Sequence, residues 1–147
     1  MRRPDNGLRP LFRQHLREGI MWTTVETGLT AGGVPDSNYL SSKGVEGWLE
    51  YKACDANRVK VRPEQIGWHL RRARYGGRSW FAIRKQHAGG AKLGDPVDEL
   101  WMVAGCYADH LSQMGLACGH AIAMGAGGPQ RWNWSGARAL ILGRVVL

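Results

Sequence analysis

The order in which helical and strand-like segments follow one another constrains the fold of this chain most strongly. Apolar residues recur at helical spacing over 7–18 and again over 63–75, and the segments around the second helix are rich in β-branched and aromatic residues. Helix, three strands, helix and strand in this order predict an α/β fold with a mixed, mainly four-stranded sheet flanked by helices. We expect these strands over 20–26, around Tyr39, over 47–52 and over 79–84.

The second expected helix has clear start and stop signals. Pro63 suits the first helical position, and a glycine pair follows residue 75. Helical spacing places Ile66, Leu70 and Ala73 on the face that we expect to be buried.

The chain has 147 residues, which fits one domain, with a core over about 7–85 and a C-terminal strand–helix extension over 86–147. Within the extension we expect a loop over 86–96, a strand over 99–103, a helix over 104–114, an irregular glycine-rich stretch over 121–130 and a short helix or strand over 134–146.

The charge is strongly basic and unevenly spread. Lysine and arginine number 20 against 12 acidic residues, which gives a formal net charge of +8. This excess makes polyanions the first partners to test, although a solvated basic surface remains the alternative. Between residues 53 and 90 nine basic side chains face only two acidic ones, and Arg9, Arg13 and Arg17 follow a four-residue spacing that lines one helical face. Charge alone does not distinguish nucleic acid from acidic protein or lipid headgroups. If the partner is DNA, the residues that we expect to contact it are Arg13, Arg17, Arg58, Lys60, Arg62, Arg71, Arg72 and Arg74.

Several other classes of protein find little support. No run of eighteen apolar residues is present, and no apolar stretch follows the basic start, so we expect neither a membrane span nor a signal peptide. Three cysteines cannot all pair within one chain, which favours a reducing cytoplasm. His69 shows no paired nucleophile, so acyl transfer is not indicated. A zinc site would need Cys106, His110, Cys118 and His120, whose spacing matches no common zinc module.

Three charged residues form a candidate site for phosphodiester hydrolysis. Side chains alternate along a strand, so Glu50 and Lys52 share one face while Leu49 and Tyr51 share the other. Asp36 and Glu50 offer the oxygen ligands that Mg²⁺ prefers, and Lys52 can orient or deprotonate an attacking water. The alternative is a strand with a surface glutamate and lysine, and Asp36 as a turn residue after a proline.

The sequence around these residues resembles the PD-(D/E)XK nucleases, most closely their stand-alone VRR-type branch found in bacteriophages. The resemblance covers residues 22–85 and rests on four pieces in order. They are Gly33-Val34-Pro35-Asp36, Gly47-Trp48-Leu49-Glu50-Tyr51-Lys52, Arg62-Pro63-Glu64-Gln65-Ile66-Gly67-Trp68, and Gly76-Gly77 followed by an apolar strand. It implies a restriction-endonuclease-like core.

The resemblance also implies roles for individual residues. Asp36, Glu50 and the backbone carbonyl of Tyr51 would bind Mg²⁺ or Mn²⁺, Lys52 would be the catalytic lysine, and Gln65 would support the site from the following helix. The family's upstream acidic residue has two candidates here. We favour Glu26, at the end of the first expected strand, over Glu18, so the number of metal ions stays open.

The expected activity is therefore a metal-dependent DNA endonuclease, acting by resemblance on branched DNA such as a Holliday junction or flap in repair or recombination. A homodimer is expected if two strands are cut symmetrically. Two alternatives stay open: a nucleic-acid-binding module that keeps the fold without cutting, and a basic protein that binds other proteins. Trp68, near the arginines of the second helix, can either stack on a base or pack in the core.

Overall fold

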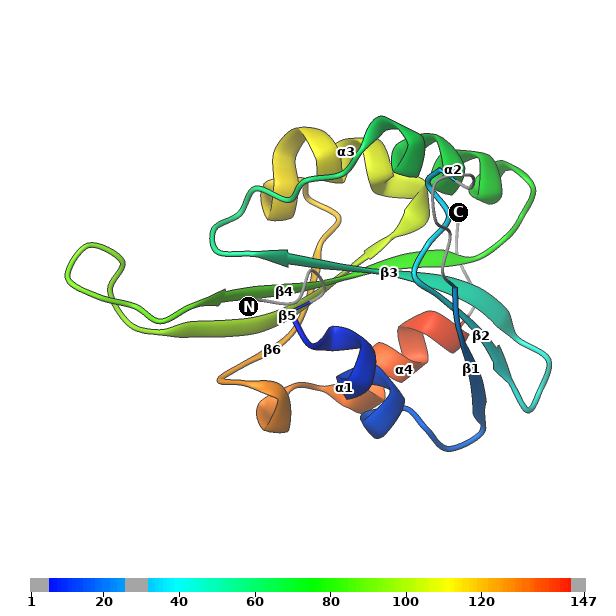
Figure 1. Cartoon of the computed structure of the whole chain (residues 1–147), viewed down its shortest axis with the longest axis horizontal. Coiled ribbons are helices and arrows are strands. Elements are labelled where there is room, and N and C mark those ends of the chain that lie inside the picture. Colours follow the sequence, from blue (N-terminus) through cyan, green and yellow to red (C-terminus); the bar gives the residue numbers. More distant parts are fainter. Residues whose placement is uncertain (1–5, 26–31, 144–147) are drawn as a thin grey trace.

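A mixed six-stranded sheet forms the centre of the molecule (Figure 1). The computed structural model describes residues 6–25 and 32–143. The strands lie side by side in chain order: β1 (Ile20–Thr24), β2 (Ser37–Ser41), β3 (Glu46–Cys54), β4 (Ser79–His87), β5 (Val97–Ala104) and β6 (Ile122–Ala126). All neighbouring pairs are antiparallel except β3 and β4, which are parallel and therefore need a crossover connection.

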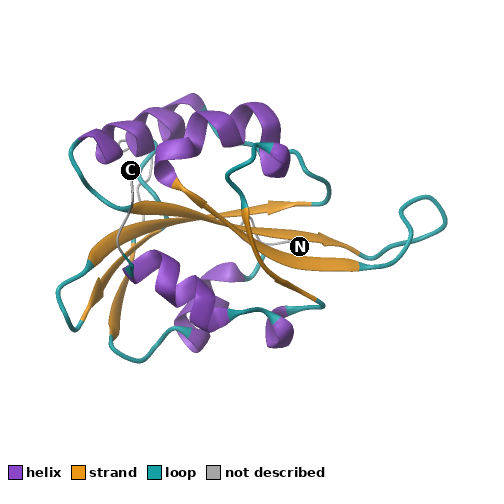
Figure 2. Cartoon of the chain, turned by 180° about the vertical axis from the view of Figure 1, so that it is seen from behind, coloured by secondary structure: helices purple, strands orange, loops and turns teal. Residues whose placement is uncertain are grey.

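Helices cover both faces of the sheet (Figure 2). The crossover between β3 and β4 is α2 (Pro63–Arg74), which lies with α3 (Ala108–Met114) on one face. The other face carries α1 (Leu8–His15) and α4 (Trp134–Leu142). Three short 3₁₀ helices complete the described elements: Gly105–Tyr107, Gly115–Ala117 and Pro129–Arg131.

Each face of the sheet has its own hydrophobic core. On the α1 and α4 face, Leu49 and Tyr51 of β3 pack with Phe12 and Ile141. The hydroxyl of Tyr39 donates a 2.6 Å hydrogen bond to the backbone carbonyl of Ile141, which ties β2 to α4. The core on the α2 and α3 face consists of Val59, Val61, Phe81, Ile83, Val103, Ala108, Leu111 and Leu116.

The α/β class and the mixed sheet are confirmed, but the expected four-stranded sheet is wrong for the described chain, which contains six strands. Residues 86–143 were expected to form an extension of one strand and one helix. They instead contribute two strands, β5 and β6, to the same sheet. The stretch over 121–130 was expected to be irregular, yet it contains β6, which pairs with β5. Of the two possibilities left open over 134–146, the structure forms a helix over Trp134–Leu142.

Two expectations about the helices are also corrected. Helix α1 ends at His15 and not at 18, because the chain turns there to enter β1 and the Trp22 indole donates to the carbonyl of Leu16. Arg17 therefore lies beyond the helix. On α2, the residues expected to be buried, Ile66, Leu70 and Ala73, are only half-buried. The fully buried positions of α2 are polar, as the next section describes.

Candidate metal and catalytic site

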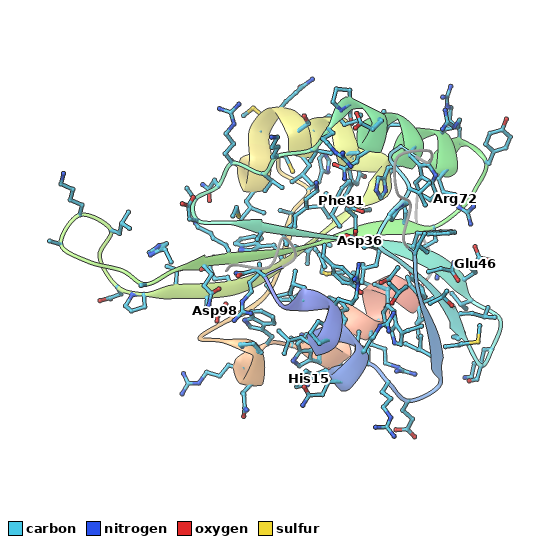
Figure 3. All side chains as sticks on the ribbon, viewed as in Figure 1. His15, Asp36, Glu46, Arg72, Phe81 and Asp98 are labelled. Carbon is cyan, nitrogen blue, oxygen red and sulfur yellow. The ribbon has the colours of Figure 1, made fainter. Side chains whose placement is uncertain are left out.

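Two acidic side chains meet where β2 begins beside β3. Asp36 immediately precedes β2, and the register of β2 with β3 places it beside Glu50. The backbone N–H of Asp36 donates to Glu50 Oε2 at 3.2 Å, and Asp36 Oδ2 accepts a 2.9 Å bond from the backbone N–H of Tyr51. Figure 3 labels Asp36 near the middle of the molecule, between the two helical layers. The structure thus brings the two predicted carboxylates together.

The loop before Asp36 is held against the start of α2. Gly33 has a φ of +87°, and a Cβ atom at this position would lie 2.1 Å from the backbone oxygen of Glu64. Only glycine combines this backbone conformation with so close an approach. The Gly-Val-Pro-Asp segment therefore places Asp36 through a contact between backbones.

Gln65 of α2 joins Glu50 and Lys52, two side chains of β3. Its Nε2 donates to Glu50 Oε1 at 2.8 Å, and its Oε1 accepts from Lys52 Nζ at 2.8 Å and from the backbone N–H of Arg62 at 3.0 Å. Lys52 Nζ also lies 3.9 Å from Glu50 Oε1. Glu50 and Lys52 therefore share the α2 face of β3, as strand alternation predicts, and one buried amide fixes them relative to each other.

Burial shifts the pKa values of Glu50 and Lys52. The pKa of Glu50 is raised to about 8, first by burial and then by the Asp36 carboxylate, with the Lys52 ammonium acting in the opposite direction. Burial lowers the pKa of Lys52, and the neighbouring carboxylates partly oppose this effect. A site with two adjacent carboxylates and a partly desolvated ammonium has more to gain from a bound divalent cation than a solvated pair would have.

Asp36 and Glu50 are ligands of the type that Mg²⁺ or Mn²⁺ takes, but they are too few to surround a metal ion completely. Among the described residues no three His, Cys, Asp or Glu side chains lie together as a metal site. Mg²⁺, however, is commonly held by one or two carboxylates, with water and substrate phosphate completing its octahedron. Asp36 and Glu50 are two adjacent carboxylates of the kind that such a site needs. Tyr51 can add only its backbone, because its hydroxyl donates to Ser37 Oγ at 3.1 Å and burial raises the pKa of its phenol to about 12.

The two candidates for an upstream acid are placed differently. Glu26 lies outside the described residues. Glu18 is exposed and lines a hollow with His15, Ser42 and Arg138, beside α4. Since α4 and α2 cover opposite faces of the sheet, this hollow is not on the side from which Gln65 reaches Glu50.

Arg9 of α1 is a site residue that its sequence position did not reveal. Its Nη2 lies 3.9 Å from Asp36 Oδ1, and both side chains are about one-third exposed. The sequence placed Arg9 only in a basic helical stripe, and no spacing signal connects residue 9 to residue 36. Its guanidinium brings positive charge to the open side of the Asp36 carboxylate.

The arginines and lysine expected to bind DNA fall into two groups. Two of them are half-buried: Arg13 donates to the hydroxyl of Thr24, and Arg72 donates to Glu46 Oε1 at 2.6 Å. The exposed ones are Arg17, Arg58, Lys60, Arg62, Arg71 and Arg74. The exposed group is therefore better placed to meet a polyanion.

His69 has the paired hydroxyl that its sequence context did not show. Its Nδ1 lies 2.7 Å from Ser79 Oγ, and both residues are buried. Burial and the charge of Lys52 lower the pKa of His69 to about 3, so the ring is neutral near pH 7. A neutral pair without access to solvent supports the packing of α2 on the sheet and offers a substrate no nucleophile.

The two histidines considered for zinc make aromatic contacts. His120 stacks on Tyr107 with ring centroids 3.7 Å apart, and His110 lies edge-on to His120 at 5.1 Å. Cys54, Cys106 and Cys118 are all unpaired.

None of the helices in the described segments has the length and apolar composition needed to cross a bilayer.

Comparison with known proteins assigns no family to this arrangement. No protein-family model matches the chain, and no curated protein matches it. The resemblance to the PD-(D/E)XK nucleases therefore remains a prediction that rests on the motifs and on their order along the chain.

Proposed function

We propose that this chain is a Mg²⁺- or Mn²⁺-dependent DNA endonuclease with a restriction-endonuclease-like core, of the PD-(D/E)XK type and similar to the VRR-type enzymes of bacteriophages. The observation that supports it most is the shared position of Asp36, Glu50, Lys52 and Gln65. These side chains come from a loop, a strand and a helix, and they meet through the hydrogen bonds of Gln65 and of the Asp36 backbone. A solvated surface strand gives no reason for such a convergence.

Each of the residues at this site would have a distinct role in cleavage. Asp36 and Glu50 would hold the cation together with the Tyr51 carbonyl. When bound, the cation would stabilise the charge that develops on the phosphate and lower the pKa of a bound water. Lys52, whose pKa is lowered by burial, would orient the attacking water or take its proton. Gln65 keeps Glu50 and Lys52 in place and is a positioning residue.

Branched DNA is the substrate that we propose, with a homodimer as the cutting form where two strands are cleaved. The exposed basic side chains of the chain would contact phosphates, which positions DNA but does not select a sequence. Selectivity would then depend on the shape of the DNA. Three unpaired cysteines agree with a reducing, cytoplasmic setting.

The test is a cleavage assay on supercoiled plasmid and on a four-way junction, each with Mg²⁺, Mn²⁺ or EDTA. Wild type should cut with either cation and not with EDTA. Asp36→Ala and Lys52→Ala should reduce the rate by about two to four orders of magnitude, because cation binding and proton transfer each contribute on that scale.

Two residues in the loop between β4 and β5 supply matched controls for these variants. Asp95→Ala and Lys92→Ala remove an exposed carboxylate and an exposed ammonium, and both proteins should cut like wild type. The proposal fails if wild type cuts neither DNA, or if Asp36→Ala cuts as fast as Asp95→Ala. Binding without cutting would favour the non-catalytic nucleic-acid-binding alternative.

A further inference from the structure

A small pocket lies on α2, the helix that also carries Gln65. It has a volume of about 240 Å³ and is lined by Trp68, Arg71, Arg72 and Tyr75. Pockets for drug-sized ligands usually measure about 300–1,000 Å³, so this one suits a single planar ring system. Positions 68, 71, 72 and 75 recur at helical spacing, which places their side chains along one stripe of α2. We call the cavity that these four residues line the α2 pocket.

Two residues of the α2 pocket, Trp68 and Arg72, are held in place by contacts with neighbouring side chains. The guanidinium carbon of Arg72 lies 5.8 Å from the ring centroids of both Trp48 and Trp68, and its Nη2 donates to Glu46. Figure 3 labels Arg72 and Glu46 at the same end of the molecule. Trp68 packs edge-on against Trp48 at 5.5 Å. These contacts hold Trp68 and Arg72 in place before any ligand arrives.

Tyr75 is the opposite case, because 87% of its surface is exposed. A tyrosine ring this exposed gains nothing from the hydrophobic core, and Gly76 ends the helix immediately after it. It lines the pocket together with Arg71, and the exposed Arg74 directly precedes it in the chain. An aromatic face among cations is the combination that binds nucleic acid strands by base stacking and phosphate contacts.

The position of the α2 pocket along the helix relates it to the candidate site. Gln65 lies in the first turn of α2, and Trp68 follows it by one turn, about 4.5 Å along the axis. Tyr75 follows Gln65 by ten residues, about 15 Å along the same axis. A DNA strand whose scissile phosphate is at Glu50 and Lys52 can therefore reach the pocket within a few nucleotides.

We propose that the α2 pocket binds an unpaired base of the DNA strand a few nucleotides from the phosphate that is cut, with Tyr75 stacking on the base and Arg71 contacting its backbone. This inference rests on the proposed nuclease function and narrows its substrate to DNA with a single-stranded segment beside the cleavage point. A fully paired duplex keeps its bases stacked on one another and offers none to Tyr75.

The test measures binding in EDTA, where no cutting occurs. Fluorescence anisotropy compares a blunt duplex with the same duplex carrying a single-stranded tail of either polarity. Tyr75→Ala should weaken binding of one tailed duplex about five- to tenfold and change the blunt duplex by less than about twofold, since stacking on one exposed ring is at the lower end of measured base–aromatic contributions. Tyr75→Phe keeps the ring and should bind like wild type.

Two further variants separate stacking from charge. Arg71→Gln should weaken binding of the tailed duplex and reduce the salt dependence of that binding by about one phosphate contact, whereas Tyr75→Ala should leave the salt dependence unchanged. Leu93→Ala removes another exposed apolar side chain, in the loop between β4 and β5, and should change neither affinity. Equal weakening of the tailed and blunt duplexes by Tyr75→Ala, or no weakening of either, overturns the proposal. The proposal is also overturned if polyglutamate displaces the tailed duplex from the protein as effectively as an unlabelled single strand does.

Cleavage of plasmid by the same proteins in Mn²⁺ keeps the two proposals apart. A wild type that cuts, with tail binding that does not depend on Tyr75, overturns the α2 pocket alone. A wild type that does not cut, with tail binding that depends on Tyr75, overturns the nuclease function and leaves a pocket for unpaired bases.

Discussion

Gln65 Nε2 donates a 2.8 Å hydrogen bond to Glu50 Oε1 across the interface between α2 and the sheet. Gln65 Oε1 accepts from Lys52 as well, so Gln65→Ala leaves both partners without their shared contact. We expect the cleavage rate to fall about 10- to 100-fold, as for other residues that orient metal ligands, and the Mn²⁺ concentration for half-maximal rate to rise.

Single-turnover cleavage at several Mn²⁺ concentrations measures both effects. Glu64→Ala, an exposed neighbour on the same helical turn, is the control and should leave both unchanged. A purely structural role for Gln65 would lower the melting temperature without moving the Mn²⁺ dependence, and that result would contradict the prediction.

Cation binding should stabilise the folded protein. At a Mn²⁺ concentration of a hundred times Kd, the melting temperature of wild type should rise by about 5–10 °C, measured by calorimetry or thermal-shift fluorescence. Asp36→Asn and Glu50→Gln each remove a ligand charge and should lose this gain. Asp95→Asn, at an exposed loop position, should keep it. An equal gain in all four proteins would place the cation elsewhere.

Glycine at position 33 should be needed for both stability and activity. Gly33 and Gly44 have nearly the same φ, +87° and +82°, but a Cβ atom meets the Glu64 backbone only at Gly33. Gly44→Ala should therefore cost about 1–2 kcal/mol of unfolding free energy from the backbone conformation alone. Gly33→Ala should cost about 1–3 kcal/mol more, because the loop must also move away from α2.

Denaturant unfolding and plasmid cleavage of these two variants test the prediction together. Gly44→Ala should cut like wild type, since the turn between β2 and β3 lies at the other end of these strands from Asp36. Gly33→Ala should cut poorly because Asp36 is displaced. Equal unfolding free energies for the two variants would be inconsistent with the steric argument.

His69 should make the fold sensitive to acid. Its pKa is about 3 in the folded protein and about 6.5 in the unfolded chain, so the unfolded chain binds more protons between these values. The stability that His69 contributes is fully present above pH 6.5 and is lost as the pH falls toward 3. The associated slope is at most about 1.4 kcal/mol per pH unit.

Urea unfolding between pH 7 and pH 4 measures this slope. His69→Asn should be less stable than wild type at pH 7 but lose less stability on acidification. His110→Asn, at an exposed histidine, should keep the wild-type slope. If His69→Asn and wild type show parallel profiles, buried neutral His69 is not a source of acid sensitivity.

The features that follow from local geometry could be predicted from the sequence. A strand alternates its side chains whatever packs on it, so Glu50 and Lys52 had to share a face opposite Leu49 and Tyr51. Pro63 and the glycine pair after residue 75 similarly predict the extent of α2, which runs over Pro63–Arg74. Strand alternation was enough to place Glu50 and Lys52 together, whereas Asp36 and Gln65 were expected at the site from the motifs around them.

The remainder depends on partners that are distant in the chain. Gln65 and His69 are buried although they are polar. Glu50 and Lys52 of β3 form hydrogen bonds with Gln65, and Ser79 of β4 forms one with His69 Nδ1. A hydrophobic pattern cannot show this, and it selected Ile66, Leu70 and Ala73 instead. β6 contains alanine and glycine, which have little strand propensity, and it forms by pairing with β5. Arg9 reaches Asp36 only because α1 folds back over the sheet.

Asp36, Glu50, Lys52 and Gln65 all fall between positions 36 and 65, whereas Tyr39 and Ile141, which help to hold β2 against α4, are 102 positions apart. The four candidate site residues thus lie in one short stretch of the chain, and the core that packs around this stretch includes residues from near both ends of the described chain. A deletion across these positions would also remove part of β2 or β3, whose Tyr39, Leu49 and Tyr51 belong to the core, so the candidate site cannot be lost without losing part of the fold.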